Sequence, residues 1–292
     1  VIDTNSDKLD KLLSELDVQG IEGNGTSFRT QMEAGIKESD LLIAVTGKDE
    51  INLLCCLIAK KAGNCNTIAR VRNPEYFDEI KYLREELGLS MAINPELACA
   101  QNIARLIEVP SALDITSFAK GRANLIQLPI PANSVVDNMT VYEFATKIHT
   151  NTLICAIERS HEVIIPDGNT VLHCGDTMYV IIPPAEIHSL LQKIGIKAKR
   201  IRSVMIIGGS TIAYYLAKHL EAAHLQVKII EQNFEQCEKL SDSLPHVMII
   251  NGDATDRQLL LEEGIDETDA FVSLTNLDEE NLVLSLFANK VS

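Results

Sequence analysis

The feature of this amino-acid sequence that most constrains its fold is an internal repeat. The C-terminal part of the chain matches the N-terminal part when residue 1 is placed on residue 229, with a single-residue gap further on. The matching segments are VIDTN (1–5) with IIEQN (229–233), GNGTS (23–27) with GDATD (252–256), and residues 34–54 with residues 263–283. Repeats of this kind mark structural units, and 292 residues suffice for two or three domains. We therefore expect two copies of one unit.

Each copy alternates short apolar runs with helical segments, a pattern typical of a doubly wound parallel sheet. In the second copy we expect strands at 203–207, 225–231, 246–250 and 268–275, with helices at 210–223, 233–244, 256–263 and from about 277. The first copy begins with the equivalent of the second strand of this order. After the segments that it shares with the second copy, it continues with strands 66–71 and 90–94 and helices 74–87 and 96–108. The fold class is thus α/β, with two such domains.

Both copies are expected to be incomplete in this chain. The first copy has no equivalent of strand 203–207 or of the glycine turn that follows it. The second copy stops where about fifty further residues would be expected by comparison with the first. Because the first strand of such a sheet is central, we expect the natural protein to extend about 25–30 residues before Val1. We expect it to extend beyond Ser292 as well.

A different segment separates the copies. Residues 112–196 give the order β-α-β-β-β-α, with turns at Pro131, Pro166 and Pro183, and predict a small mixed domain. Residues 195–203 read as a basic linker. We therefore divide the chain into domains at 1–111, 112–196 and 203–292.

Composition excludes several classes of function. A net charge of −15 argues against binding to nucleic acid or to anionic lipid, because both need a basic face. The sequence has no apolar run of the ~18 residues needed for a membrane span and no signal peptide. The seven cysteines are scattered and never spaced C-x-x-C, which favours a reducing cytosol.

The segment SVMIIGGSTIA (203–213) raises the possibility of a nucleotide site. A buried strand ends at Ile207 and is followed by Gly208, Gly209, Ser210, Thr211, Ile212 and Ala213, where a dinucleotide-binding turn has G-x-G-x-x-G. Gly208 supplies the tight turn. Ser210 keeps a small side chain with a hydroxyl, and Ala213 is a tolerated packing variant. A plain strand-to-helix turn is the alternative for this degenerate motif.

Acidic residues at the end of the next strand strengthen the nucleotide interpretation. Glu231 follows Gly208 by 23 residues, where a carboxylate accepts from ribose hydroxyls, and Asp3 is its counterpart in the first copy. An acid here favours NAD(H) or an adenine nucleotide over NADP. Asp3 has a second interpretation as the N-cap of the helix that begins around residues 4–6. We expect Asp253 to lie near the adenine.

Two further residue types occur at the same predicted sheet edge. Thr46 and Thr275 end the fourth strand of each copy and are followed by D-E-x-N-L. They are either ligand contacts or ordinary helix caps. Arg70 ends the fifth strand of the first copy and is either a phosphate ligand or part of a surface ion pair.

Together, these segments resemble the TrkA family, the cytosolic regulatory subunits of bacterial Trk-type potassium uptake. The resemblance rests on VIDTN, GNGT, DLLIAVTGKDEINLL, IARVRNPEY and INPELACAQNIARLIEVPSALD, and it covers essentially the whole chain. It implies two nucleotide-binding RCK (KTN) domains around a TrkA-C domain, and nucleotide-dependent gating of a membrane potassium transporter of the TrkH/TrkG type. The chain would be cytoplasmic, at the inner face of the membrane, and would not insert into it.

By position, the resemblance implies two ligand sites. Asp3, Thr46, Gly47 and Arg70 would line the first. Residues Ile207 to Ile212, Glu231, Asp253 and Thr275 would line the second. The implied ligands are NAD(H) and, as an alternative, ATP or ADP.

An NAD-dependent oxidoreductase with an unrecognised substrate domain is the alternative function. It would require an acid or base beside the nicotinamide, and the seven histidines fall mostly in the middle domain or on outer helices. The pattern shows neither a metal spacing nor a nucleophile elbow, so we expect a protein that is not an enzyme. We also expect a dimer or tetramer, because helix 96–108 has a broad apolar stripe.

Overall fold

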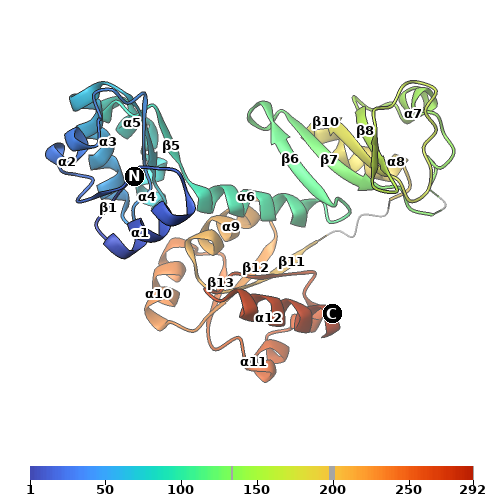
Figure 1. Ribbon diagram of the computed structural model, residues 1–292. Helices are drawn as coiled ribbons and strands as arrows, with labels where there is room; N and C mark the ends of the chain where they lie inside the picture. Colours follow the sequence, from blue (N-terminus) through green and yellow to red (C-terminus); the bar gives the residue numbers. More distant parts are fainter. Residues whose placement is uncertain (133, 197–200, 292) are drawn as a thin grey trace. The chain divides into compact units, whose positions relative to one another are not determined.

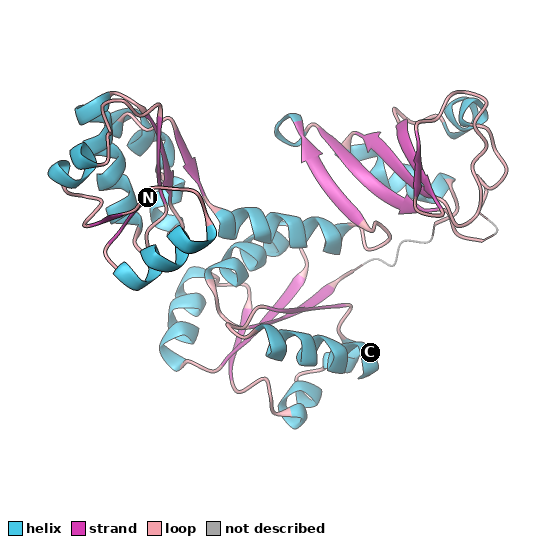
Figure 2. Cartoon of the chain, in the orientation of Figure 1, coloured by secondary structure: helices cyan, strands magenta, loops and turns pink. Residues whose placement is uncertain are grey.

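The computed structural model describes residues 1–132, 134–196 and 201–291, and it contains two compact units, residues 1–98 and 99–292. Figures 1 and 2 show the elements of both units. Part of the predicted linker, residues 197–200, lies outside the described residues.

The first unit consists of short parallel strands and the helices between them. Its strands are β1 (Ile2–Asp3), β2 (Ile21–Glu22), β3 (Leu41–Ala44), β4 (Asn66–Arg70) and β5 (Met91–Ile93). Its helices are α1 (Ser6–Glu15), α2 (Phe28–Glu33), α3 (Asp49–Gly63), α4 (Pro74–Asp78) and α5 (Ile80–Leu87), and α6 (Pro95–Glu108) begins in it. The predicted helix 74–87 is interrupted at Glu79, whose ψ of 6° departs from helical geometry.

The second copy of the repeat forms one four-stranded parallel sheet in the order β13-β12-β11-β14. Its strands are β11 (Ser203–Ile207), β12 (Gln226–Glu231), β13 (Met248–Asn251) and β14 (Ala270–Ser273). Its α-helices are α9 (Thr211–Ala222), α10 (Phe234–Ser243), α11 (Arg257–Glu262) and α12 (Asp278–Val291). All pairings are parallel, and the α/β fold class predicted from the sequence is confirmed.

The central strand β11 organises this sheet. It pairs with β12 on one side and β14 on the other, and Val204 to Ile207 are all at most 2% exposed. Met205 and Ile207 pack with Leu284 and Ala288 of α12, while the alternate residues face the opposite layer. Figure 1 shows α9 and α10 on one side of the sheet and α12 on the other. Burial on both faces explains why this strand is apolar without alternation.

The first copy has two separate sheets in place of one. Strands β1 and β2 form one sheet, and β3, β4 and β5 form the other. In residues 1–98, all of which have described backbone, no strand takes the position that β11 has between β12 and β14. The side chains of Leu41 and Ile43 on β3 are accordingly 46% and 55% exposed.

The middle region folds as a five-stranded antiparallel sheet in the order β6-β7-β10-β8-β9 (Figure 2). Its strands are β6 (Asp114–Phe118), β7 (Ala123–Pro129), β8 (Leu153–Arg159), β9 (Glu162–Ile164) and β10 (Thr177–Ile182), with helices α7 (Val141–Ile148) and α8 (Ile187–Lys193). The sequence interpretation missed β6, because Asp114, Thr116 and Ser117 hide its apolar alternation. Ile115 is its one buried residue.

An ion pair between the half-buried Arg159 and the buried Asp176 fixes the turn that leads into β10. Arg159 Nε and Nη2 donate to the two carboxylate oxygens of Asp176 at 2.8 and 2.7 Å, and His173 N–H donates to the same carboxylate at 2.8 Å. Asp176 is 2% exposed. Burial by itself would raise the pKa of Asp176, but these hydrogen bonds and the Arg159 charge outweigh it and lower the pKa.

We expect Asp176→Asn to lower the free energy of unfolding at pH 7 by about 2–3 kcal/mol, because Arg159 loses its charged partner. A carboxylate with a depressed pKa in the folded state stabilises above its unfolded pKa and loses that contribution as the pH falls through the folded pKa. The difference between wild type and variant should therefore vanish in strong acid. Urea unfolding across this pH range measures it. Glu162→Gln, an exposed change on β9, is the control and should have little effect at any pH.

Candidate nucleotide site at the carboxyl edge of the second sheet

A tight turn joins β11 to α9 at the carboxyl end of the sheet. Gly208 has φ +91°, and a Cβ there would lie 2.7 Å from the carbonyl oxygen of Leu274. Its N–H donates to the carbonyl of Ile230 at 2.8 Å, and Leu274 N–H donates to the carbonyl of Ile207 at 2.8 Å. Only glycine meets both the dihedral angle and the close backbone approach.

The next residue, Gly209, is held by two side chains from β12 and α10. Glu231 Oε2 accepts from its N–H at 2.6 Å, and Gln236 Nε2 donates to its carbonyl at 2.7 Å. A Cβ on Gly209 would come within 2.8 Å of Leu240 Cδ1 and 3.0 Å of Glu231 Oε2. Glu231 Oε1 also accepts from Asn233 N–H at 2.7 Å. The acidic residue thus connects the end of β12 to the glycine turn.

Ser210 is the N-cap of α9. Its Oγ accepts from Ala213 N–H at 3.3 Å, so part of the hydroxyl's capacity is used within the helix. Ala213 is fully buried at the sheet. The first N–H groups of the helix have no intrahelical acceptor and point toward the sheet edge.

A cavity of about 510 Å³ opens over this turn. Of the residues predicted for the second site, those that line it are Ile207, Gly208, Gly209, Ser210, Thr211, Glu231, Asp253 and Thr275. Ile212 does not line it. The sequence interpretation missed Gln236 and Glu280, which also line the cavity. Glu280 is the variable position of D-E-x-N-L. Its position in the first turn of the helix after β14, at the carboxyl edge of the sheet, is the feature of the sequence that could have predicted it as a cavity residue.

Asp253 forms a local turn at the cavity wall. Its Oδ1 accepts from Thr255 N–H at 2.9 Å and from Thr255 Oγ1 at 2.8 Å. These hydrogen bonds, the backbone one foremost, lower the pKa of Asp253. The carboxylate is therefore ionised at neutral pH.

The repeated threonines are held by the asparagine of D-E-x-N-L. Asn52 is fully buried, and its Oδ1 accepts from Thr46 N–H at 2.7 Å. Asn281 Oδ1 accepts from Thr275 N–H at 2.8 Å. The N-cap position of α3 is Lys48, so Thr46 is not the cap. This motif fixes the strand end in both copies.

Three of the residues predicted for the first site lie together beyond β3 and β4. Arg70 Nη2 donates to the carbonyl of Thr46 at 2.8 Å, and Arg72 Nη2 donates to the carbonyl of Gly47 at 2.6 Å. The ion pair at this edge joins Arg72 to Asp49 at 3.5 Å. Among the described residues, the buried Nε of Arg70 has no hydrogen-bond acceptor.

Asp3 is the last residue of β1, in the other sheet of the first unit. Its Oδ1 accepts from Asn5 N–H at 2.9 Å. The N-cap of α1 is Asn5, whose Oδ1 accepts from Lys8 N–H at 3.0 Å, so the interpretation of Asp3 as the cap is wrong. The Asp3–Asn5 contact matches the Glu231–Asn233 contact in the second copy.

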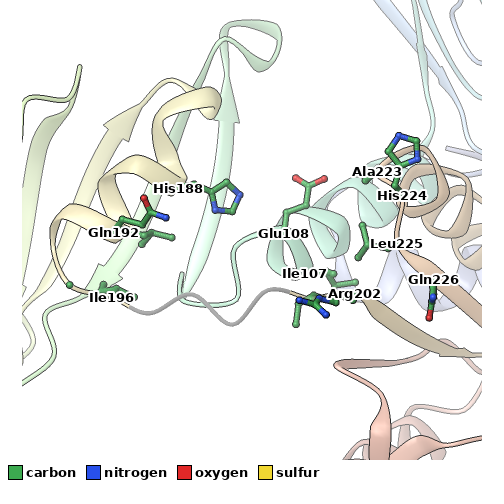
Figure 3. Close-up of a pocket in the computed structure, with 13 residues that line it drawn as sticks. Ile107, Glu108, His188, Gln192, Ile196, Arg202, Ala223, His224, Leu225 and Gln226 are labelled. Carbon is green, nitrogen blue, oxygen red and sulfur yellow. The ribbon is translucent and has the colours of Figure 1, made fainter.

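Figure 3 shows a different cavity in the second unit. Among the side chains around it are Glu108 of α6, His188 and Gln192 of α8, and His224 after α9. None of the residues predicted to bind a nucleotide belongs to it. Within the described part of the chain, no group of three His, Cys, Asp or Glu residues is arranged to hold a metal ion. The same part contains no helix with the length and apolar character needed to cross a bilayer.

The parallel sheet, the glycine turn after its central strand and the acid that ends the neighbouring strand define a Rossmann-like domain in the second copy of the repeat. The first copy shares the acid and the strand ends. Residues 1–95 and 204–292 match the TrkA-N domain, and residues 125–195 match the TrkA-C domain. The chain belongs to the TrkA family.

Curated relatives agree with this assignment. The chain is 38% identical over 279 residues to a Trk system potassium uptake protein TrkA homolog of Archaeoglobus fulgidus, covering 96% of this chain and 63% of the relative. It is 34% identical over 295 residues to the TrkA protein of Vibrio alginolyticus, covering 100% of this chain and 64% of the relative. The chain thus spans less than two thirds of the length of these relatives.

A solved structure has the same fold. The GsuK channel bound to NAD matches 100% of this chain and 51% of its own, with a TM-score of 0.71 at 20% identity. At that identity, the likeness concerns the fold.

We expect Gly208→Ala to destabilise the second Rossmann-like domain more than Gly264→Ala does. Both glycines have positive φ, which costs alanine about 1 kcal/mol, but only Gly208 would also bring a Cβ against backbone, whereas Gly264 has open space. The clash adds about 1–3 kcal/mol. Thermal unfolding of the two variants measures the difference, and equal unfolding temperatures would contradict the turn geometry.

Proposed function

We propose that the second Rossmann-like domain binds NAD(H) or an adenine nucleotide in the cavity over Gly208. The observation that carries this proposal is the Glu231–Gly209 contact, which sets a carboxylate, a glycine turn and a helix N-terminus beside one cavity. In this arrangement the pyrophosphate lies over residues 208–212, where the N–H groups of α9 favour an anion. The ribose binds Glu231, and the adenine lies near Asp253.

The first domain has a related site in this proposal. Thr46, Gly47 and Arg70 lie at one sheet edge, where the Arg70 guanidinium donates to the carbonyl of Thr46 and carries the charge that a phosphate needs. Asp3 corresponds to Glu231 and takes the ribose.

The chain acts, we propose, as a regulatory part of a potassium uptake system and not as an enzyme. Family membership supports this role, because the relatives are named potassium uptake proteins. A ligand that prefers one arrangement of the domains by about 1–3 kcal/mol changes the activity of a coupled membrane transporter 5- to 150-fold. The partner is a TrkH/TrkG-type transporter at the inner face of the membrane. Each chain has three domains, at residues 1–111, 112–196 and 203–292. Two or four such chains assemble into a dimer or a tetramer.

Glu231→Ala tests the second site. We expect it to weaken nucleotide affinity at least tenfold, because one or two hydrogen bonds to a charged acceptor are lost, each worth about 1.5–3 kcal/mol. Calorimetric titration of the full chain with NAD⁺, NADH, ADP and ATP measures this. Glu235→Ala, an exposed change in the first turn of α10, is the matched control. Unchanged affinity in the Glu231 variant would show that the turn is only structural.

The absence of turnover separates this proposal from the oxidoreductase alternative. NADH mixed with the full chain and a protein-free filtrate of cell metabolites should keep the absorbance of its reduced nicotinamide, because the protein binds the cofactor without oxidising it. The control is the filtrate with NADH alone. Sustained oxidation above that control would favour the enzyme.

A further inference from the structure

Two asparagines of this chain are followed by glycine, Asn24 and Asn251. An Asn-Gly pair is prone to deamidation, because glycine has no side chain to hinder the attack of its own amide nitrogen on the asparagine Cγ. Asn24 follows β2 in the first copy of the repeat, and Asn251 ends β13 in the second. Both asparagines are exposed, so access of water does not distinguish them. The hydrogen bonds around the reacting atoms do.

The side-chain carbonyl of Asn24 already has two hydrogen-bond donors. Its Oδ1 accepts from Thr26 N–H at 2.9 Å and from Thr26 Oγ1 at 2.8 Å. When a nitrogen attacks Cγ, negative charge develops on this oxygen. Donors that are already placed at such an oxygen stabilise the charge, as in an oxyanion hole. The turn therefore polarises the Asn24 side chain in the direction that the reaction needs.

The attacking nitrogen belongs to Gly25 and must first lose its proton. The charge that results is shared with the backbone carbonyl of Asn24, which accepts from Ser27 N–H at 2.9 Å. Among the described residues the Gly25 N–H has no acceptor. Its counterpart in the second copy is Ala254, whose N–H has none there either, although β11 and its glycine turn are present. The turn itself thus leaves this nitrogen unbonded.

Asn251 is held in the opposite way. Its Nδ2, which would have to leave, donates to the carbonyls of Glu231 and Gln232, both at 3.0 Å. The N–H of Gly252, which would have to attack, donates to the carbonyl of Glu231 at 3.0 Å. These hydrogen bonds join the carboxyl ends of β12 and β13. The reaction at Asn251 therefore requires this end of the sheet to open.

The second copy shows that an aspartate fits the turn at Asn24. Asp253 is the counterpart of Asn24, and its Oδ1 accepts from Thr255 N–H at 2.9 Å and from Thr255 Oγ1 at 2.8 Å. These distances equal those of the Asn24 turn. An aspartate at position 24 thus keeps the turn and adds a negative charge. An isoaspartate lengthens the backbone by a carbon atom, so it does not fit the same turn.

We propose that Asn24 is a deamidation site, and that the fold directs the reaction to Asn24 and away from Asn251. The Gly25 amide gives its proton to a base in solution, and its nitrogen forms a bond to Cγ of Asn24. The bond from Cγ to Nδ2 breaks, and Nδ2 takes a proton from water and leaves as ammonia.

Water then opens the cyclic imide that this step forms. Cleavage of the new bond between the Gly25 nitrogen and Cγ gives aspartate, whereas cleavage between that nitrogen and the backbone carbonyl carbon of residue 24 gives isoaspartate. The net change is the uptake of a water and the release of an ammonia. The aspartate form has at position 24 the acid that the second copy has at Asp253.

Mass spectrometry can follow both asparagines in one sample, because each is the only asparagine in its tryptic peptide, residues 12–29 and 240–257. The folded full chain is kept in mildly alkaline buffer, digested at mildly acidic pH, and assayed for a mass gain of about 1 Da in each peptide. We expect Asn24 to react at least about tenfold faster than Asn251. In urea, where both are unfolded Asn-Gly pairs, the two rates should be similar. Similar rates in the folded chain, or no reaction at either site, would overturn the proposal.

Thr26→Val tests the contribution of the turn, since it removes the Oγ1 donor and keeps the backbone donor. We expect the reaction at Asn24 to slow about threefold to tenfold. Thr116→Val, the same change at an exposed position on β6, is the matched control and should leave the rate unchanged. Asn251 reports unfolding in each sample, because its rate rises when the sheet opens. An Asn24 rate as high as that of the wild type, with Asn251 still protected, would contradict the role assigned to Thr26.

Discussion

The carboxylate of Glu231 is the interaction on which the second domain's sheet edge depends. It accepts from Gly209 N–H and from Asn233 N–H, and so connects β12, the glycine turn and the start of α10. A partly buried carboxylate with two backbone donors is held in one geometry. Gln236 fixes the other side of the same peptide group. The turn is therefore positioned before any ligand enters, which lowers the entropic cost of binding.

The two copies share the same side-chain-to-backbone hydrogen bonds, although the charges at their sheet edges differ. The Thr46–Asn52 and Thr275–Asn281 contacts end the strand in the same way, and the Asn24 and Asp253 turns have the same geometry. Backbone support is thus common to both copies, while charge at the edge varies between them.

Much of the fold follows from periodicity alone. Strand β11 is apolar on both faces, and the helices between the strands have the length of crossover connections, so the parallel pairing was predictable. Strand β6 was not, because a half-exposed edge strand with polar alternate residues has almost no apolar signal. The interpretation of Asp3 as the helix cap was wrong, because the cap is Asn5. Asp and Asn are equally good N-cap residues, so the sequence could not distinguish the two positions.

The sequence by itself determined the duplication, the α/β class and most of the residues that meet at the edge of the second sheet, because a repeat and the carboxyl ends of parallel strands constrain position strongly. Only the tertiary structure decided how those residues are used. The partners of Glu231, the capping role of Ser210 and the presence of Gln236 and Glu280 at the cavity depend on side-chain directions across three strands. Those directions are set by packing between elements far apart in the chain, which no local pattern records.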